Sequence, residues 1–202
     1  MKNQLKGKFL KSKFSIFLLC AIIFLFGFTA PLTKTLKIDK QKSKIKILGT
    51  SNLHDWDETL TNFDGELTIQ IKDDNIKTVQ SSNLNFYSNS IKSGNSIMDN
   101  KTKGALKVEK FPVINFKTIL FKEAKDINDK KQINILGNLT MAGITKTIEV
   151  DGMNTILPTG GIYFEGKKEI NMSDYGIEPP TAFFGSLKVG NKVTIIFNIY
   201  FN

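Results

Sequence analysis

The stretch VTIIFNIYF at residues 193–201 decides how this chain folds. Its odd-numbered positions are all apolar, whereas polar residues interrupt the even-numbered positions at Thr194 and Asn198. Because successive side chains of a strand point to opposite faces, this alternation is typical of a β-strand with one face in a protein core. The same period recurs at three earlier places, which are residues 44–47, 67–71 and 133–139. The chain is therefore predicted to be rich in half-buried strands.

Further segments with strand character lie between clusters of turn-forming residues. The additional strands are expected at 77–86, 113–122, 145–153 and 162–171, and the hairpin turns at 73–75, 128–129, 142–143 and 159–161. Between residues 96 and 107 the alternation stops and apolar residues are spaced among lysines, which predicts a single helix there. We therefore expect an all-β fold. It would be a single antiparallel β-barrel of about eight strands with one short helical insert, because closure of the sheet removes its exposed edges.

Residues 1–30 have the layout of an export signal. Lysines without any acid precede an apolar run from Phe14 to Phe28, as in a secretory signal peptide. Ala30 is small enough for a cleavage site, although Phe28 two residues before it is not. Two outcomes stay open: removal of the segment, or its retention as an N-terminal anchor that keeps the protein near a membrane. Both predict an extracytoplasmic location, periplasmic or secreted, for one barrel domain over residues 31–202.

The charge and cysteine content exclude several function classes. The chain has 28 basic and 19 acidic residues, and every basic residue is a lysine. Five lysines lie in residues 1–30, so the other 23 lysines against 19 acids leave residues 31–202 with a net charge of +4. Without arginine or a concentrated basic patch, nucleic acid is not an expected partner. The only cysteine, Cys20, lies in the export segment, so the mature domain has no disulfide and no thiol chemistry.

The only histidine and the only tryptophan stand together in GTSNLHDW, residues 49–56. One histidine is too few for most transition-metal sites and no phosphate-binding loop is present, so we expect no metal, no cofactor and no enzymatic activity. Ser51, His54 and Asp55 lack the geometry of a catalytic triad. Three roles stay open for His54: a pH-sensitive switch, a ligand contact, or a tie for the strand end. His54 and Trp56 share a parity, so we expect Trp56 mostly buried with His54 near it, at a barrel end or cavity lining.

Four segments, in order along the chain, resemble the YceI-like family of exported polyisoprenoid-binding proteins. They are 49–56; 98–101 with 105–107 and 110–116; 136–146; and 172–180 followed by Gly185. The resemblance implies a lipocalin-like barrel with a long apolar cavity that holds an isoprenoid chain in an extracytoplasmic compartment. The second segment departs from the family, because it keeps Asp99 but lacks the arginine and the histidine that many members carry there.

A ligand in such a barrel would contact interior apolar side chains and lysines at the mouth. The predicted ligand-binding residues are His54, Trp56, Phe86, Met98, Ile114, Phe116, Leu139, Phe183 and Phe184. The predicted head-group residues are Lys101 and Lys103, which could meet a diphosphate as point charges.

The function that we expect depends on whether the barrel interior is filled by side chains or contains a cavity. From the residues alone a filled core is the default for a small barrel, whereas the family resemblance favours a cavity. We therefore expect an exported binding protein for a polyisoprenoid or another long-chain lipid. The alternative is an exported structural or stress-related barrel with a packed interior that binds a partner on its outer surface. The size of the interior cavity separates the two.

Overall fold

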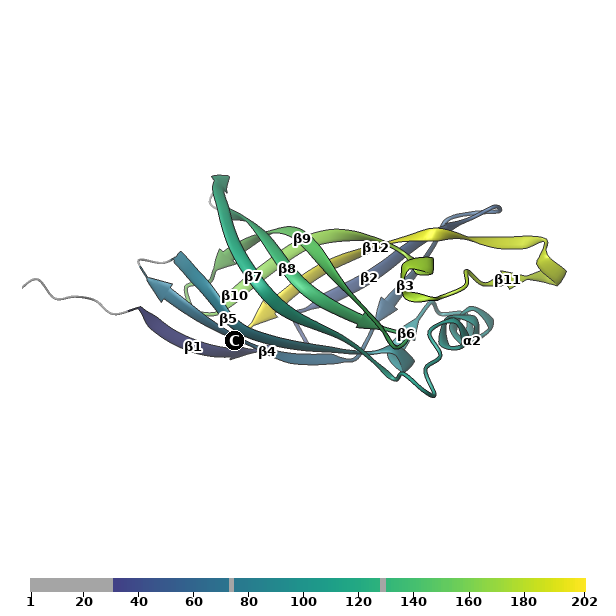
Figure 1. The fold of residues 1–202 in the computed structure, drawn as a ribbon, viewed down its shortest axis with the longest axis horizontal. Helices are drawn as coiled ribbons and strands as arrows, with labels where there is room; N and C mark the ends of the chain where they lie inside the picture. Colours follow the sequence, from purple (N-terminus) through teal and green to yellow (C-terminus); the bar gives the residue numbers. More distant parts are fainter. Residues whose placement is uncertain (1–30, 73–74, 128–129) are drawn as a thin grey trace, which may run out of the picture. The chain divides into compact units, whose positions relative to one another are not determined.

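A computed structural model describes residues 31–72, 75–127 and 130–202. Over these residues the chain forms an antiparallel sheet that curls into a barrel, with one α-helix at one end (Figure 1). The expected export segment at 1–30 and parts of two expected turns, 73–74 and 128–129, lie outside the described residues. No helix in the described part of the chain is long and apolar enough to cross a membrane.

The elements follow one another as a series of strands interrupted by a helical insert. The strands are β1 (Leu32–Lys37), β2 (Lys44–Ser51), β3 (Trp56–Leu60), β4 (Phe63–Lys72), β5 (Asn75–Tyr87), β6 (Ile91–Lys92), β7 (Val113–Ile127), β8 (Lys130–Met141), β9 (Ile144–Ile156), β10 (Ile162–Asn171), β11 (Thr181–Ala182) and β12 (Leu187–Phe201). The helix is α2 (Ser96–Ala105), and the short 3-10 turns are η2 (Ser88–Ser90), η3 (Met172–Tyr175) and η4 (Phe183–Gly185).

Every strand pairing is antiparallel, and the strand order is β1-β4-β5-β7-β8-β9-β10-β12-β2-β3-β6, with β11 paired to β12. The sheet meets itself next to the C-terminus, where Ile38 bridges Phe201. There Lys37 and Asn202 exchange two backbone hydrogen bonds of 2.8 and 2.9 Å. This closure satisfies backbone groups that an open sheet would leave at its edges. The predicted fold class, an antiparallel barrel with one helical insert, is confirmed.

The strand count differs from the expected eight, since the described residues contain twelve strands. The unpredicted ones are β1, β3 and the two-residue strands β6 and β11. In β3 the side chains of Trp56 and Leu60 share a parity with Glu58, and all three positions are at least half-buried. A carboxyl on the inward face breaks the apolar alternation by which strands are recognised in a sequence.

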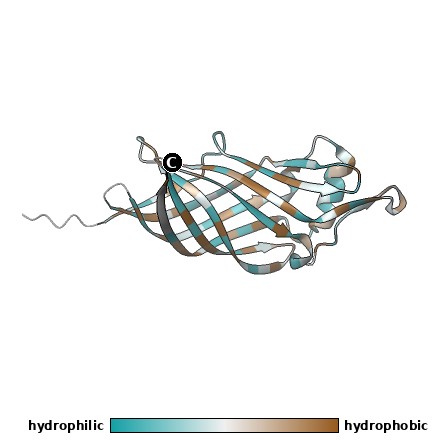
Figure 2. Ribbon diagram, turned by 90° about the horizontal axis from the view of Figure 1, so that it is seen from above, coloured by the Kyte–Doolittle hydropathy of each residue, from teal (hydrophilic) through white to brown (hydrophobic). Residues whose placement is uncertain are grey.

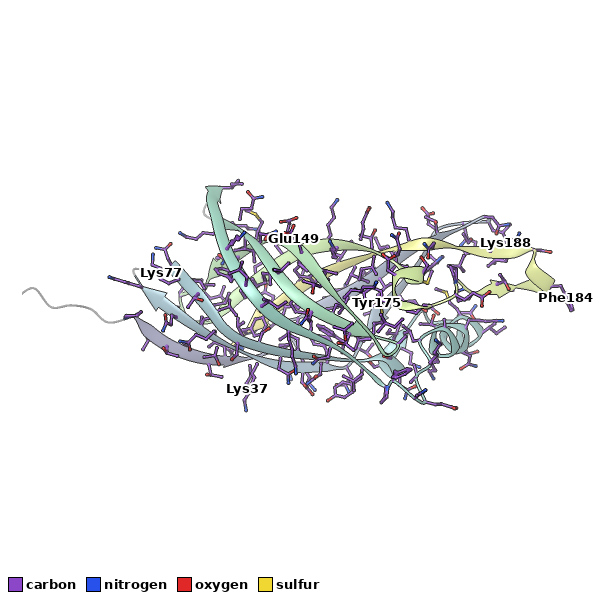
Figure 3. All side chains as sticks on the ribbon, in the orientation of Figure 1. Lys37, Lys77, Glu149, Tyr175, Phe184 and Lys188 are labelled. Carbon is purple, nitrogen blue, oxygen red and sulfur yellow. The ribbon has the colours of Figure 1, made fainter. Side chains whose placement is uncertain are left out.

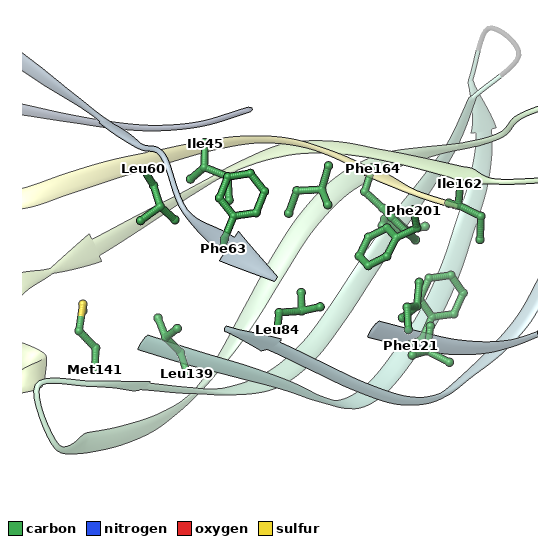
Figure 4. Close-up of a cluster of buried hydrophobic side chains, with 14 of the residues drawn as sticks. Ile45, Leu60, Phe63, Leu84, Phe121, Leu139, Met141, Ile162, Phe164 and Phe201 are labelled. Atoms are coloured by element: carbon green, nitrogen blue, oxygen red, sulfur yellow. The ribbon is translucent and has the colours of Figure 1, made fainter. Parts of the chain in front are cut away.

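Alternation of hydrophobic and hydrophilic residues is visible along the strands (Figure 2). The apolar side chains form one buried cluster. Buried apolar side chains from many strands form the core on the inner side of the sheet (Figure 4). There Phe164 on β10 and Phe201 on β12 meet edge to face, with ring centroids 5.7 Å apart, beside Ile162, which is fully buried. This packing lies next to the seam where Ile38 meets Phe201.

Candidate functional site

The interior of the barrel contains an apolar chamber of about 190 Å³, called here the inner chamber. Only apolar atoms are exposed on its wall. Four of the predicted ligand-binding residues line it: Phe86 on β5, Ile114 and Phe116 on β7, and Leu139 on β8. Because an apolar cavity of about 150 Å³ stays dry and accepts small apolar molecules, the inner chamber is large enough for part of a hydrocarbon chain.

The polar groups around the inner chamber need no partner from a ligand. Ser82 Oγ donates to Thr118 Oγ1 at 2.7 Å and accepts from the backbone N–H of Thr118 at 2.8 Å. Lys168 also borders the chamber, but only apolar atoms face it, as when a lysine lays its methylene stem on an apolar surface. The inner chamber therefore suits a hydrocarbon without polar groups.

A second, outer chamber of about 590 Å³ lies at the helical end of the barrel. Its walls come from α2, the turn between β2 and β3, η3, β11 and the first part of β12. Both chambers are lined by Ile47, Ile91, Ile114, Met141, Ile170 and Ile195. Since they share these side chains, the two chambers adjoin and form one elongated interior that is apolar at depth and partly polar at the outer end.

One face of α2 covers the outer chamber. The helix residues that line the chamber are Ile97, Met98, Lys101, Thr102 and Ala105. Their spacing of three to four residues places them on a single helix face. The helix begins after Asn95, whose side-chain oxygen accepts hydrogen bonds from the backbone N–H groups of Ile97 and Met98 at 2.9 and 3.3 Å. This cap fixes where the helix starts over the chamber.

The turn between β2 and β3 is held by the hydroxyl of Ser51. Ser51 Oγ donates to the carbonyl oxygen of His54 at 2.7 Å and accepts from the His54 backbone N–H at 3.1 Å. His54 Nδ1 lies 2.8 Å from the carbonyl oxygen of Asp55, so this nitrogen acts as the donor. The exposed His54 side chain also borders the outer chamber. Of the three open roles, the geometry supports a tie for the strand end and a position for a ligand contact.

Trp56 lies beside this turn and packs on a glycine. Its indole ring covers Gly49, where an added Cβ would come within 2.0 Å of the ring, and its Nε1 donates to the carbonyl oxygen of Thr50 at 3.0 Å. Trp56 lines the outer chamber near His54, as expected. It is half-buried and not mostly buried, because it lies at the rim instead of the core.

A carboxyl group lies inside the outer chamber. Glu58 on β3 is only 2% exposed, and its Oε1 accepts a hydrogen bond of 2.6 Å from Thr102 Oγ1 on α2. Burial raises the pKa of Glu58, the nearby Asp99 carboxylate adds to the rise, and the Thr102 hydrogen bond opposes it. Asp99 is different, since hydrogen bonds from the backbone and hydroxyl of Ser93 and an ion pair with Lys92 at 3.4 Å lower its pKa. Lys92 thus supplies a basic partner that the segment around Asp99 lacks.

Some of the remaining predicted residues line the outer chamber and others do not. Met98 and the exposed Lys101 line the outer chamber, whereas Lys103 points away from the lining face of α2. Phe184 was expected inside but is fully exposed at the tip that joins β11 and β12, with a left-handed φ of 55° (Figure 3). The tight turn directs its ring away from the barrel, so the prediction for Phe184 is wrong. The side chain of Phe183 lies outside what the structure describes.

Many lining residues were not predicted from the sequence, and two of them carry the polar chemistry that matters most at the outer chamber. Glu58 and Thr102 both border the outer chamber and hydrogen-bond to each other across 44 residues of sequence. The signal for Glu58 was present, since it shares the parity of Trp56 and Leu60, but a lone acid on a strand usually faces solvent. In the described part of the chain, no three His, Cys, Asp or Glu side chains come together in a way that could hold a metal ion.

Comparisons with known proteins agree with this fold. A family model for the YceI-like domain matches residues 36–201. Protein YceI of Salmonella arizonae is 28% identical over 174 residues, which are 80% of this chain and 84% of the relative. Protein YceI of Salmonella paratyphi B matches over the same shares with the same identity.

Solved structures with a similar fold include BcnA of Burkholderia cenocepacia, with a TM-score of 0.64 and 19% identity over 81% of this chain and 98% of that chain. A polyisoprenoid binding domain from Saccharophagus degradans, implicated in plant cell wall breakdown, has a TM-score of 0.65 and 14% identity, and the match covers 83% of this chain and 97% of that one. The YCEI protein of Campylobacter jejuni has a TM-score of 0.54 and 19% identity over 71% and 82% of the two chains. At these identities the likeness is one of fold.

Proposed function

Because this chain belongs to the YceI-like family, we propose that it is an exported protein that binds a hydrophobic lipid, a polyisoprenoid, inside its barrel. It acts as a carrier, store or scavenger of that lipid and not as an enzyme. The observation that carries the proposal is the pair of adjoining chambers, of about 190 and 590 Å³, in the barrel interior. The printed description of the Saccharophagus domain as polyisoprenoid binding supports the same ligand class.

The energetics of the inner chamber favour an isoprenoid chain. Apolar surface removed from water contributes about 25 cal/mol per Å² before the costs of association are subtracted. A chain that fills the inner chamber replaces water or empty space by contacts with side chains such as Phe116 and Leu139. The outer chamber, within the range of about 300–1,000 Å³ typical of small-molecule sites, has room for the head group and the rest of the chain.

The packed-barrel alternative fits the structure less well. It requires side chains to fill the interior, whereas two adjoining chambers of about 190 and 590 Å³ remain there. Phe184 is the feature that fits an outer-surface partner, since it is an exposed aromatic ring. One exposed ring is ordinary on a protein surface and does not make an interface.

Export remains part of the proposal and rests on residues 1–30. The barrel would then work in the periplasm or outside the cell. Retention of the segment would hold the barrel close to a membrane that contains isoprenoid lipids.

The test is mass spectrometry of organic extracts from the protein purified from its native host. We expect a long-chain isoprenoid near one equivalent per barrel, and none in extracts of an unrelated exported protein purified in parallel. The intact mass of the same sample tells whether residues 1–30 are removed or retained. Recovery of protein free of lipid, together with failure to take up added polyisoprenoid, would leave the packed-barrel alternative standing.

A further inference from the structure

Glu58 is the one buried carboxyl that borders the outer chamber in the described part of the chain. Its Oε1 accepts from Thr102, and the described residues offer no hydrogen bond to Oε2 and no basic side chain in an ion pair with the carboxyl. A buried acid without a counter-ion is costly and is usually found where it meets a ligand or titrates.

We propose that Glu58 makes the outer chamber select isoprenoids with an uncharged, hydrogen-bonding head group over isoprenoids with a phosphate head group. The inference rests on the proposed lipid-binding function and adds the class of head group. Glu58 acts as a specificity-determining residue in the outer chamber, where the head group of the ligand would lie.

The ionised form of the carboxyl group gives this selection. An ionised Glu58 accepts a hydrogen bond from a hydroxyl group, whereas a protonated Glu58 could donate to a carbonyl or a phosphate oxygen alike and would not discriminate. A phosphate head group brings only acceptors at full ionisation, so it gains nothing from the ionised carboxylate and is repelled by it. In a buried site this repulsion is weakly screened.

The lysine at the chamber does not offset Glu58. Lys101 also borders the chamber, but it is exposed, so water and salt screen its attraction for a phosphate. On the side of α2, Asp99 is paired with Lys92 at 3.4 Å and accepts hydrogen bonds from Ser93, so its charge is compensated. Glu58 has no such partner, and its charge is the uncompensated one at the chamber.

The experiment compares two probes that share a hydrocarbon tail: geranylgeraniol and geranylgeranyl monophosphate. Binding is followed by the fluorescence of Trp56, the only tryptophan of the chain, which lines the same chamber. We expect the parent protein to bind the alcohol at least about tenfold more tightly than the phosphate. Glu58→Gln keeps the acceptor for Thr102 and removes the charge, so it should tighten phosphate binding and reduce the preference to about threefold or less.

Thr102→Val is the matched control, because it removes the hydrogen bond between α2 and Glu58 but keeps the carboxyl group, and it is compared with the parent at a pH at which Glu58 is ionised in both proteins. It should change the affinities for both probes by the same factor and preserve the preference. The inference is overturned if Glu58→Gln leaves the preference unchanged, or if it shifts both affinities equally as a merely structural residue would. Failure of the parent protein to bind either probe would overturn the lipid-binding function itself, and this inference with it.

Discussion

At the scale of single residues, Glu58 and the stretch 49–56 do most to shape the outer chamber. Gly49 leaves room for the indole of Trp56, and the Ser51 hydroxyl closes the turn that sets His54 at the rim. Glu58 follows two residues after Trp56 and faces inward on the same strand. A short segment therefore provides an aromatic wall, an exposed imidazole and a buried carboxyl for one chamber.

Glu58 should also make the stability of the barrel depend on pH. Burial raises its pKa in the folded state, so the folded protein binds more protons than the unfolded chain between the ordinary glutamate pKa and the raised value. Stability should fall as pH increases through that window, and the penalty is complete above the raised pKa. Glu58→Gln removes the penalty, so we expect the variant to be more stable than the parent at pH 8 by about 1–3 kcal/mol.

The measurement is denaturant unfolding of the parent and of Glu58→Gln at pH 4 and pH 8. The other carboxyl groups titrate in both proteins, so the difference between the two isolates Glu58. The two proteins should be nearly equal in stability at pH 4, because Glu58 is then largely protonated in both states. An equal difference at both pH values would show that the charge of Glu58 costs nothing in the folded barrel.

At the scale of elements, α2 is the helix that covers the outer chamber. It packs over the outer chamber through one face, and one side-chain hydrogen bond among the described residues, from Thr102 to Glu58, links that face to β3. The Lys92–Asp99 ion pair holds its first turn to β6. These few contacts make α2 easier to displace than the strands, which are held by continuous ladders of hydrogen bonds.

The N-cap of α2 should therefore control how fast a ligand leaves. Asn95→Ala removes the acceptor for the backbone N–H groups of Ile97 and Met98 and should destabilise the helix by about 1 kcal/mol. We expect amide hydrogen exchange in α2 to become about fivefold faster, exchange in β8 to stay unchanged, and probe release to accelerate by a similar factor.

Asn100→Ala is the control for this prediction, because Asn100 lies in the same helix, is exposed and caps nothing. It should leave hydrogen exchange and probe release close to those of the parent. If Asn95→Ala releases the probe as slowly as the parent although amide hydrogen exchange in α2 is faster, the ligand leaves by another route.

At the scale of the whole barrel domain, the interior differs between the helical end and the part near the C-terminus. Phe164, Ile162 and Phe201 pack together next to the seam at which the strands of the barrel meet. The helical end carries α2 and the outer chamber. A ligand that enters at the helical end can extend its tail only into the inner chamber, whose volume of about 190 Å³ limits the length of chain that fits.

A charge placed in the inner chamber should abolish lipid binding. Phe116 lines the chamber and the next residue, Lys117, is exposed on the opposite face of β7. Phe116→Glu should weaken probe binding at least about a hundredfold, because the ligand would have to displace water from a carboxylate. Lys117→Glu should change binding by no more than about twofold.

A second variant fills the inner chamber with an apolar side chain and adds no charge. Val150→Phe adds volume to the wall of the inner chamber and should exclude the tail while the barrel stays folded, as followed by circular dichroism. Normal binding by Val150→Phe and Phe116→Glu, both correctly folded, would place the ligand outside the barrel. Lys101→Ala should have a smaller effect than either, and one that shrinks at high salt.

The sequence by itself determined the fold class, the position of the helix and many of the residues that face the interior. Period-2 alternation such as that of 193–201 requires a strand with one buried face, and apolar residues spaced among lysines at 96–107 predicted the helix observed at Ser96–Ala105. These features are local, because side-chain direction on a strand or helix follows from the backbone geometry of neighbouring residues.

Only the tertiary structure decided which apolar residues line a chamber and which polar residues join them. In β7 a bulge after Thr118 shifts the parity, so that Ile119 and Leu120 are exposed and Phe121 is buried again. Phe116 and Phe184 are alike as residues, yet one lines the inner chamber and the other is in solvent. Glu58 is hydrogen-bonded to Thr102, which is distant in sequence. The burial of Glu58 and its choice of partner depend on how the sheet closes and where α2 packs on it.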